Sequence, residues 1–328
     1  MTRLQQAAIE THSPPVTCVG HSRPVVDIHF SVLNDEGKYY MISASKDNKA
    51  MIREGDTGDW IGTLVGHQNI VWSARLSRYA HRAVTGSADC FVKVWDTSNG
   101  QELASFENEY TVRTVNFSPD ATRIVAGGRE KKLKIYDLYR PDAPALEGRA
   151  YQGTIRATVW HPSHQSILIS GCEDGNIRVH DTRIMRSHVT CFPTSDVAVS
   201  CINLTADGET VYWGAKHQVY FWSLALGFSH DPTMITRHEM SKPVKTVSVH
   251  PNGEKFVYGS DEDSNIHICE AMSGKELEAR EGHKDRIHSV SYSPDGELFA
   301  TGSEDSQIRL WQTNPTKSYG LWQTTSTP

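Results

Sequence analysis

Cysteine pairs, long apolar runs and an excess of positive charge are all missing from this 328-residue sequence. The six cysteines are scattered and form no C-x-x-C pair, which argues against zinc knuckles and against a disulfide framework. No run of 18 apolar residues occurs, and residues 1–15 lack the apolar core of a secretory signal peptide. We therefore expect reduced thiols, no membrane span, and a cytoplasmic and nuclear location.

Net charge and motif content exclude further classes of function. Lys and Arg number 33 against 39 Asp and Glu, so the net charge of −6 supplies no global positive field, and direct nucleic acid binding is not predicted. The sequence has no G-x-S-x-G, Walker or G-x-G-x-x-G loop, and His238-Glu239 is not followed by the second histidine of a zinc site. We expect a protein that is not an enzyme, with no cofactor and no metal.

What the sequence does contain is a repeat of short segments in which apolar and polar residues alternate. Thr85-Gly86-Ser87-Ala88-Asp89 leads to Lys93-Val94-Trp95-Asp96, and the acid precedes the tryptophan by six residues. Gly-His pairs stand before several units, and Pro-Asp or Pro-Asn turns follow their first strands. The register extends to seven positions that are spaced 41 to 47 residues apart: Arg53, Trp95, Tyr136, His180, Trp222, Cys269 and Trp311.

These markers resemble the WD40 repeat family, whose blades have four strands and a period in the low forties. The resemblance implies an all-β fold, a seven-bladed WD40 β-propeller. It also implies a buried network, here called a tetrad, formed by a histidine, a Ser or Thr, an Asp and a Trp. Despite their likeness to a catalytic triad, these residues are interpreted as structural. The complete tetrads are His67, Thr85, Asp89 and Trp95 in blade 2, and His283, Thr301, Asp305 and Trp311 in blade 7.

The other blades depart from the tetrad pattern. Blade 1 has Arg53 at the tryptophan position, and Glu130 and Lys216 replace the acid in blades 3 and 5. We expect these blades to be less rigid than blades 2 and 7.

Closure of the ring requires an extra strand, because a ring of four-stranded blades otherwise leaves an exposed edge where its ends meet. Residues 15–19 resemble the fourth strand that precedes a Gly-His pair elsewhere, and we predict that they complete blade 7. Residues 319–323 could compete for this place. The expected organisation is a flexible tail over residues 1–13, a propeller over 14–323, and a flexible end over 324–328, as a monomeric propeller within a larger complex.

Two stretches that generic WD40 rules do not require narrow the resemblance: Gly55-Asp56-Thr57-Gly58-Asp59-Trp60 and Thr316-Lys317-Ser318-Tyr319-Gly320-Leu321-Trp322. They are similar to the family of serine/threonine kinase receptor-associated, or Unr-interacting, proteins. That resemblance implies a scaffold, an accessory subunit of the SMN complex that docks on Gemin proteins in spliceosomal snRNP assembly and so serves mRNA splicing. It further implies roles with receptor kinases in TGF-β signalling and with an Unr-like RNA-binding protein in translation. The acidic tail of that family has no counterpart in these residues.

Two other interaction proteins remain as alternatives. One is a protein like subunit i of translation initiation factor 3, which is also a seven-bladed WD40 protein. The other is a substrate receptor of cullin-RING ubiquitin ligases, because Val179-His180-Asp181-Thr182-Arg183 is close to a Trp-Asp-x-Arg motif.

The residue five positions after the Gly-His histidine, or its equivalent, should line one end of the central channel in every blade. We call these positions the rim: Val26, Trp72, Arg113, Arg156, Ser200, Lys245 and His288. Trp72, Arg113, Arg156, Lys245 and His288 would make the rim basic and aromatic, suited to binding a partner protein. Ordinary solvation of a channel mouth is the alternative.

Two further stretches receive structural interpretations. The basic run at residues 129–134 is interpreted as a solvated turn. Residues 55–60 are interpreted as an exposed turn on the face opposite the rim, with too few oxygen ligands for a metal.

Overall fold

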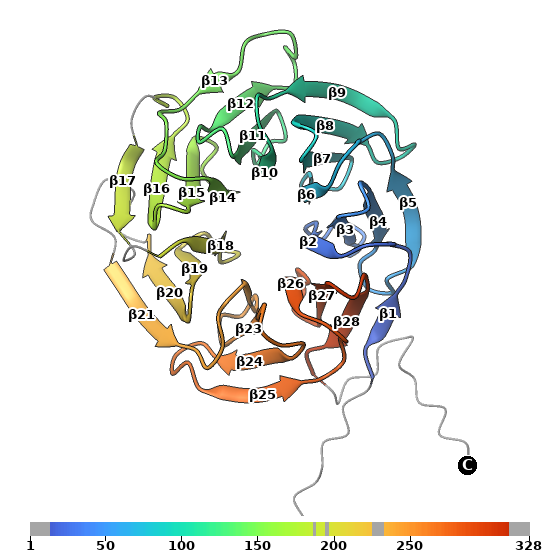
Figure 1. Ribbon diagram of the computed structural model, residues 1–328, viewed down its shortest axis with the longest axis vertical. Helices are drawn as coiled ribbons and strands as arrows, with labels where there is room; N and C mark the ends of the chain where they lie inside the picture. Colours follow the sequence, from blue (N-terminus) through green and yellow to red (C-terminus); the bar gives the residue numbers. More distant parts are fainter. Residues whose placement is uncertain (1–13, 186–187, 194–196, 225–232, 315–328) are drawn as a thin grey trace, which may run out of the picture.

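The computed structural model describes residues 14–185, 188–193, 197–224 and 233–314. They form seven four-stranded antiparallel sheets set radially around a central channel, with the strands of each blade ordered from the channel outward (Figure 1). The all-β fold and the seven-bladed propeller are therefore confirmed. No helix in the described residues is long and apolar enough to cross a membrane.

Each blade contributes four strands. Blade 1 comprises β2 (Val25–Phe30), β3 (Tyr40–Ser45), β4 (Ala50–Glu54) and β5 (Trp60–Leu64). Blade 2 comprises β6 (Val71–Leu76), β7 (Arg82–Ser87), β8 (Phe91–Asp96) and β9 (Glu102–Glu107). Blade 3 comprises β10 (Val112–Phe117), β11 (Arg123–Gly128), β12 (Lys134–Asp137) and β13 (Leu146–Glu147). Blade 4 comprises β14 (Ile155–Trp160), β15 (Ile167–Cys172), β16 (Asn176–Asp181) and β17 (His188–Pro193).

Blades 5 to 7 repeat the plan. Blade 5 comprises β18 (Val199–Leu204), β19 (Thr210–Ala215), β20 (Gln218–Ser223) and β21 (Thr233–Glu239). Blade 6 comprises β22 (Thr246–Val249), β23 (Lys255–Gly259), β24 (Ile266–Glu270) and β25 (Glu276–Arg280). Blade 7 comprises β26 (Ile287–Tyr292), β27 (Leu298–Ser303) and β28 (Ile308–Gln312), with β1 (Val16–Cys18) as its outer strand.

The first strand of the chain closes the ring as predicted. β1 pairs antiparallel with β28, and Val16 lies opposite Leu310 while Cys18 lies opposite Ile308. The competing segment 319–323 and both predicted tails lie outside the described residues. A single propeller therefore joins the two ends of the described chain within blade 7.

In six of the seven blades, a glycine in the second strand packs against the next blade, at or just before its first strand. A Cβ added at Gly86 would lie 2.7 Å from Val112 Cγ1 of the next blade, and one added at Gly259 would lie 2.6 Å from Ile287 Cγ2. Gly127, Gly171, Gly214 and Gly302 make equivalent approaches. The Thr-Gly-Ser repeat therefore records a packing requirement between blades, since no larger side chain fits without displacing its neighbour.

Both complete tetrads have the hydrogen bonds expected of them. In blade 2, the His67 ring joins Asp89 (2.8 Å) and Thr85 (2.7 Å), and Trp95 Nε1 donates to Thr85 Oγ1 (2.8 Å). In blade 7, the four equivalent residues repeat this pattern at 2.7 to 2.9 Å. The tetrads tie the loop before the first strand to the turn between the second and third strands.

The imperfect blades replace the missing tetrad bonds with others. In blade 1, His21 still joins Asp47 (2.8 Å) and Ser43 (2.9 Å), and Arg53 occupies the tryptophan position. In blade 4, Tyr151 takes the place of the histidine, and its hydroxyl bonds Ser170 and His180, each at 2.7 Å. The lower rigidity expected of blades 1, 3 and 5 stays a prediction.

The tetrad carboxylate of blade 2 should make stability depend on acid pH. Burial raises the pKa of Asp89, but the bonds from His67 and the Gln68 amide outweigh this effect and lower the pKa to about 2. Because the folded pKa lies below the unfolded value of about 3.9, this contribution to stability is complete above that value and is lost as pH falls toward 2. Asp89→Asn should cost about 1–2 kcal/mol at pH 7, allowing for partial solvent access, and less at pH 3.

Urea denaturation of the wild type and of Asp89→Asn at both pH values measures this difference. Asp56→Asn is the control, because Asp56 bonds only the adjacent Thr57 amide in an exposed turn. An equal loss at pH 7 and pH 3 would contradict the assignment.

Candidate functional site at the channel mouth

The predicted rim residues stand at irregularities in the first strands. In six blades the pairing register between the first and second strands shifts around the rim residue: Val26, Trp72, Arg113, Arg156, Ser200 and His288. In blade 6, Lys245 directly precedes β22 and its amide donates to the Gly259 carbonyl (2.9 Å). A β-bulge leaves one residue outside the ladder and re-aims its side chain. Here the bulges place the rim side chains at the channel.

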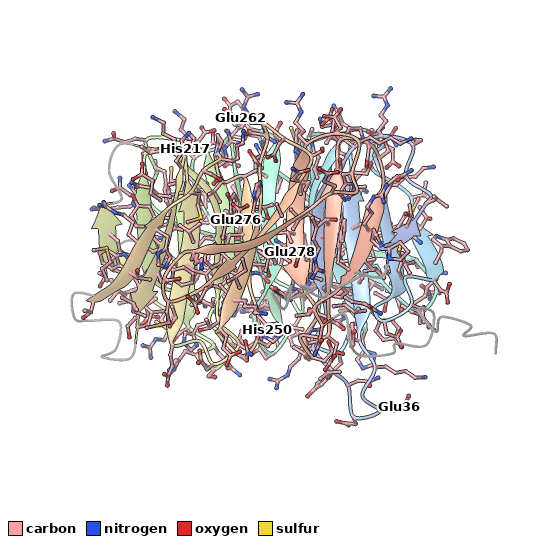
Figure 2. The ribbon with its side chains drawn as sticks, turned by 90° about the horizontal axis from the view of Figure 1, so that it is seen from below. Glu36, His217, His250, Glu262, Glu276 and Glu278 are labelled. Carbon is pink, nitrogen blue, oxygen red and sulfur yellow. The ribbon has the colours of Figure 1, made fainter. Side chains whose placement is uncertain are left out.

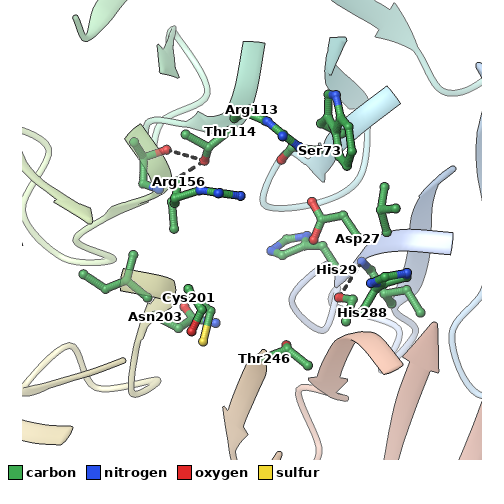
Figure 3. A pocket seen from close by; sticks show the side chains of 18 of the residues that line it. Asp27, His29, Ser73, Arg113, Thr114, Arg156, Cys201, Asn203, Thr246 and His288 are labelled. Atoms are coloured by element: carbon green, nitrogen blue, oxygen red, sulfur yellow. Dashed lines mark hydrogen bonds between the residues drawn. The ribbon is translucent and has the colours of Figure 1, made fainter. Parts of the chain in front are cut away.

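All seven rim residues line one cavity of about 580 Å³ in the channel. Figure 3 shows Arg113 and Arg156 on neighbouring strands, with His288 across the pocket from them. The side view in Figure 2 separates the two faces of the disc: His217 and Glu262 lie on one face, and Glu36 and His250 lie on the other. The spacing of five residues after the Gly-His histidine therefore identified one cavity-lining residue in each of the seven blades.

Directly below the rim, hydroxyl groups join the first strands of adjacent blades. Thr114 Oγ1 accepts from the Thr158 amide (3.1 Å), Thr246 Oγ1 accepts from the Val290 amide (3.1 Å), and Ser289 Oγ accepts from the Ile28 amide (3.0 Å). Ser73 Oγ receives the Val115 amide at 3.4 Å. These four bonds join blades 2 and 3, 3 and 4, 6 and 7, and 7 and 1, so they hold the first strands together at four of the seven blade boundaries.

Three of the rim side chains have a carboxylate beside them: Arg156, Lys245 and His288, whose pKa burial lowers so that its ring is neutral at pH 7. Arg156 Nε donates to Glu173 Oε1 (2.7 Å), and Lys245 Nζ lies 3.7 Å from Asp261 Oδ2. Glu304 accepts from His288 and from Lys46, with a distance of 2.9 Å from the Lys46 Nζ. The sequence analysis did not find these acids. All three follow the second strand in the turn that carries the tetrad acid, which is the signal that could have found them.

Arg113 differs from the other rim cations. Its guanidinium carbon lies 3.7 Å from the centre of the Trp72 ring, a close cation–π contact between blades 3 and 2. Its Nε is buried and has no hydrogen-bond partner within the described residues. Burial lowers the pKa of Arg113 to about 10, and the charges of Arg156 and Arg129 act in the same direction. Arg113 remains a cation at pH 7, and it is the rim charge least compensated by its surroundings.

Deeper in the channel, β2 and β6 contribute a charged pair. Asp27 accepts from Arg75 and from the Ala74 amide (3.2 Å). Burial lowers the pKa of His29 well below its usual value, and the Arg75 charge adds to this effect. Within the described residues, no group of three or more His, Cys, Asp or Glu side chains is placed to hold a metal ion.

Two other stretches singled out in the sequence form ion pairs within the chain, and of these residues only Arg129 acts on a rim residue, Arg113. In the basic run, Lys132 pairs with Glu147 (3.1 Å) in a half-exposed contact, whereas the side chains of Lys134 and Glu130 pair at 2.7 Å and are only 12% and 11% exposed. The interpretation as a solvated turn therefore holds only for the start of the run, because Lys134 already belongs to β12. The Asp-x-Arg pair of blade 4 is intramolecular, since Arg183 Nη2 lies 2.6 Å from Asp181 Oδ2.

Comparison with known proteins agrees with the repeat pattern. The family model described as "WD domain, G-beta repeat" matches residues 58–96, 100–137, 146–181 and 274–312. The Cps50 (Swd1) beta-propeller domain of Myceliophteria thermophila superimposes with a TM-score of 0.81 at 16% identity, covering 92% of this chain and 100% of that chain. This likeness concerns the fold alone.

Comparison with curated sequences shows which WD40 proteins this chain is similar to. The chain is 40% identical to the human serine-threonine kinase receptor-associated protein over 94% of its own length and 85% of the relative. It is 26% identical to eukaryotic translation initiation factor 3 subunit I of Drosophila erecta, over 90% of this chain and 95% of that protein. The chain therefore belongs to the serine-threonine kinase receptor-associated protein family of WD40 proteins.

Proposed function

We propose that this protein is a non-enzymatic scaffold that docks partner proteins at the channel mouth, as an accessory subunit of the SMN complex in spliceosomal snRNP assembly. One observation carries the docking part of the proposal: the rim residues of all seven blades line a single cavity of about 580 Å³, and Arg113, Arg156 and Trp72 are among them. Arg and Trp are enriched at the energetic centres of protein interfaces. Membership in the family supports the choice of partners, with Gemin proteins first.

Further roles follow from the same family membership. We propose receptor kinases of TGF-β signalling and an Unr-like RNA-binding protein as additional partners, with the propeller present as a monomer in the cytoplasm and the nucleus. Direct contact with nucleic acid is not part of the proposal, since the chain carries a net charge of −6. Affinity purification of the tagged chain at low salt, followed by mass spectrometry, tests the partners. Recovery of SMN and Gemin proteins supports the proposal, whereas recovery of initiation-factor 3 subunits or of a cullin adaptor favours the alternatives.

Charge reversal at the rim should abolish docking. In the double variant Arg113→Glu and Arg156→Glu, we expect recovery of the partner to fall by about tenfold or more, because buried interfacial charges contribute more than 1.4 kcal/mol each. Quantitative mass spectrometry of the purified complexes measures the loss. Arg78→Glu is the control, since Arg78 is exposed and lies outside the cavity. Unchanged recovery with the double variant would exclude the rim as the docking site.

A further inference from the structure

Within the described residues, Arg113 forms no ion pair, and its buried Nε has no hydrogen-bond partner, although the side chain is half-buried in the channel mouth. Arg156, Lys245 and His288 are each paired with an acid. A buried polar group without a partner is costly, and native proteins satisfy the great majority of them. Arg53 and Arg309 also have a buried Nε without a partner, so the unpartnered Nε alone does not distinguish Arg113. What distinguishes Arg113 is that it lines the cavity and forms no ion pair within the described residues, which makes it the rim cation best placed to meet an anion from outside the chain.

The contact with Trp72 fixes the direction of the Arg113 guanidinium. Stacking at 3.7 Å occupies one planar face of the group with the Trp72 ring. The N–H groups of arginine lie in that plane, in the fork geometry that matches carboxylate and phosphate oxygens. Because the Nε of Arg113 is buried, its two Nη groups are the donors that an anion would meet. Trp72 itself stands at a bulge next to Ser73, whose hydroxyl accepts from the Val115 amide of blade 3, so the backbone that carries the donor is held in place.

The charges around Arg113 are positive on balance. Arg156 lies on the neighbouring first strand and lines the same cavity, and exposed Arg129 stands in the turn that follows β11. Glu173 is the nearby acid that opposes them, and it already accepts from Arg156 and from the Thr154 amide (3.2 Å). Three guanidinium groups against one carboxylate leave a net charge of about +2, which matches the charge of about −1.5 to −2 on a phosphoryl group at pH 7.

We propose that Arg113, together with Arg156 and Arg129, forms an anion subsite that takes the phosphoryl group of a phosphorylated serine or threonine on an extended segment of a partner protein. The proposal rests on the proposed function, in which the channel mouth docks a protein. The cavity of about 580 Å³ is within the range that holds a few side chains. Nucleic acid fits less well, because stacking of bases needs free aromatic faces and one face of Trp72 is covered by Arg113.

Fluorescence polarisation with the full chain tests the subsite. The probe is a fluorescein-labelled, degenerate ten-residue peptide pool with a fixed central phosphoserine, and the matched pools carry serine or glutamate at that position. We expect the phosphoserine pool to bind, the serine pool to show no saturable binding, and the glutamate pool to bind at least about tenfold more weakly. Inorganic phosphate at millimolar concentration should compete with the phosphoserine pool.

Single substitutions of arginine test whether Arg113 binds the phosphoserine pool. Arg113→Gln should weaken binding of the phosphoserine pool by about tenfold to a hundredfold, and Arg129→Gln, which changes only an exposed side chain, should weaken it severalfold. Arg78→Gln is the matched control, because Arg78 also lies over an aromatic ring, that of Tyr79 at 5.6 Å, but outside the cavity. Thermal melts show whether each variant is folded. If Arg113→Gln fails to fold, the result with Arg129→Gln decides.

Several outcomes would overturn the subsite. Equal binding of the serine or glutamate pool, full binding by both arginine variants, or tighter binding of a ten-nucleotide RNA would each exclude it. A different experiment excludes docking at the rim: normal recovery of partners by the double variant Arg113→Glu and Arg156→Glu. Partner recovery that needs the rim, together with an absence of phosphopeptide binding, would leave the scaffold proposal intact and remove the phosphoryl proposal.

Discussion

Replacing Gly86 with valine should lower the free energy of unfolding by at least about 3 kcal/mol, since overpacking in a core that cannot relax is strongly destabilising. A Cβ at this position lies 2.7 Å from Val112 Cγ1 and 2.9 Å from Val115 Cγ1, inside the contact distance of two buried side chains of the next blade. The two branches of valine would extend further into blade 3. Urea denaturation followed by circular dichroism measures the loss.

Two milder substitutions calibrate this effect. Gly86→Ala should cost about 1–3 kcal/mol, because blade 1 carries Ala44 at the equivalent position and still packs with Val71 of blade 2. Gly62→Ala should be neutral or slightly stabilising, since nothing lies within 4 Å of its Cβ. A Gly86→Val protein as stable as Gly62→Ala would show that the blades can separate freely at this point.

Replacing Arg53 with alanine should cost about 2–4 kcal/mol and should loosen the closure of the ring. The buried guanidinium of Arg53 donates to the carbonyl of Gly58 (3.0 Å), in the turn after β4, and to the carbonyl of Val19 (2.5 Å), just after β1. Since β1 belongs to blade 7 and Arg53 belongs to blade 1, this side chain connects the two blades that meet where the ring closes. Its removal leaves both carbonyls without this donor and leaves a void.

Hydrogen exchange separates a local effect from a global one. In Arg53→Ala, the amide of Thr17 in β1 should exchange faster relative to amides of blade 4 than it does in the wild type. Arg78→Ala removes an exposed arginine and should change neither stability nor exchange by a measurable amount. Uniformly faster exchange across all blades would mean that Arg53 supports the whole fold rather than the closure.

The hydrogen bond from Arg53 to Gly58 shows what residues 55–60 contribute to the fold. A Cβ at Gly58 would lie 2.5 Å from Cys18 Sγ and 2.9 Å from Leu310 Cδ1, so the turn packs directly against blade 7. The backbone of Gly58 has a φ of 77°, which a residue with a side chain rarely adopts. The interpretation as a turn holds, and Trp60 is 60% exposed at the start of β5. The turn is nevertheless part of the closure and not a free surface loop.

The repeat, the number of blades and the rim positions were predicted from the sequence alone, whereas for the closing strand the sequence favoured residues 15–19 but left residues 319–323 as a competitor. Each depends on local periodicity: a strand alternates every two residues, a blade recurs about every 42 residues, and the Thr-Gly-Ser and Trp-Asp segments report packing within one blade or against the next. Even blades with poor motifs could be placed, because their neighbours set the register.

The tertiary structure alone decided which charges meet. Glu173 and Asp261 pair with the rim cations Arg156 and Lys245, and Glu304 bonds the rim ring of His288, whereas Arg113 stacks on Trp72 from another blade and forms no ion pair within the described residues. The β-bulges that aim these side chains into the channel leave no mark in composition or spacing. Arg53 looked like a defect in the repeat, yet it bonds the turn of its own blade and the strand that closes blade 7. Such pairings join residues far apart in the chain, and only the closed ring brings them within bonding distance.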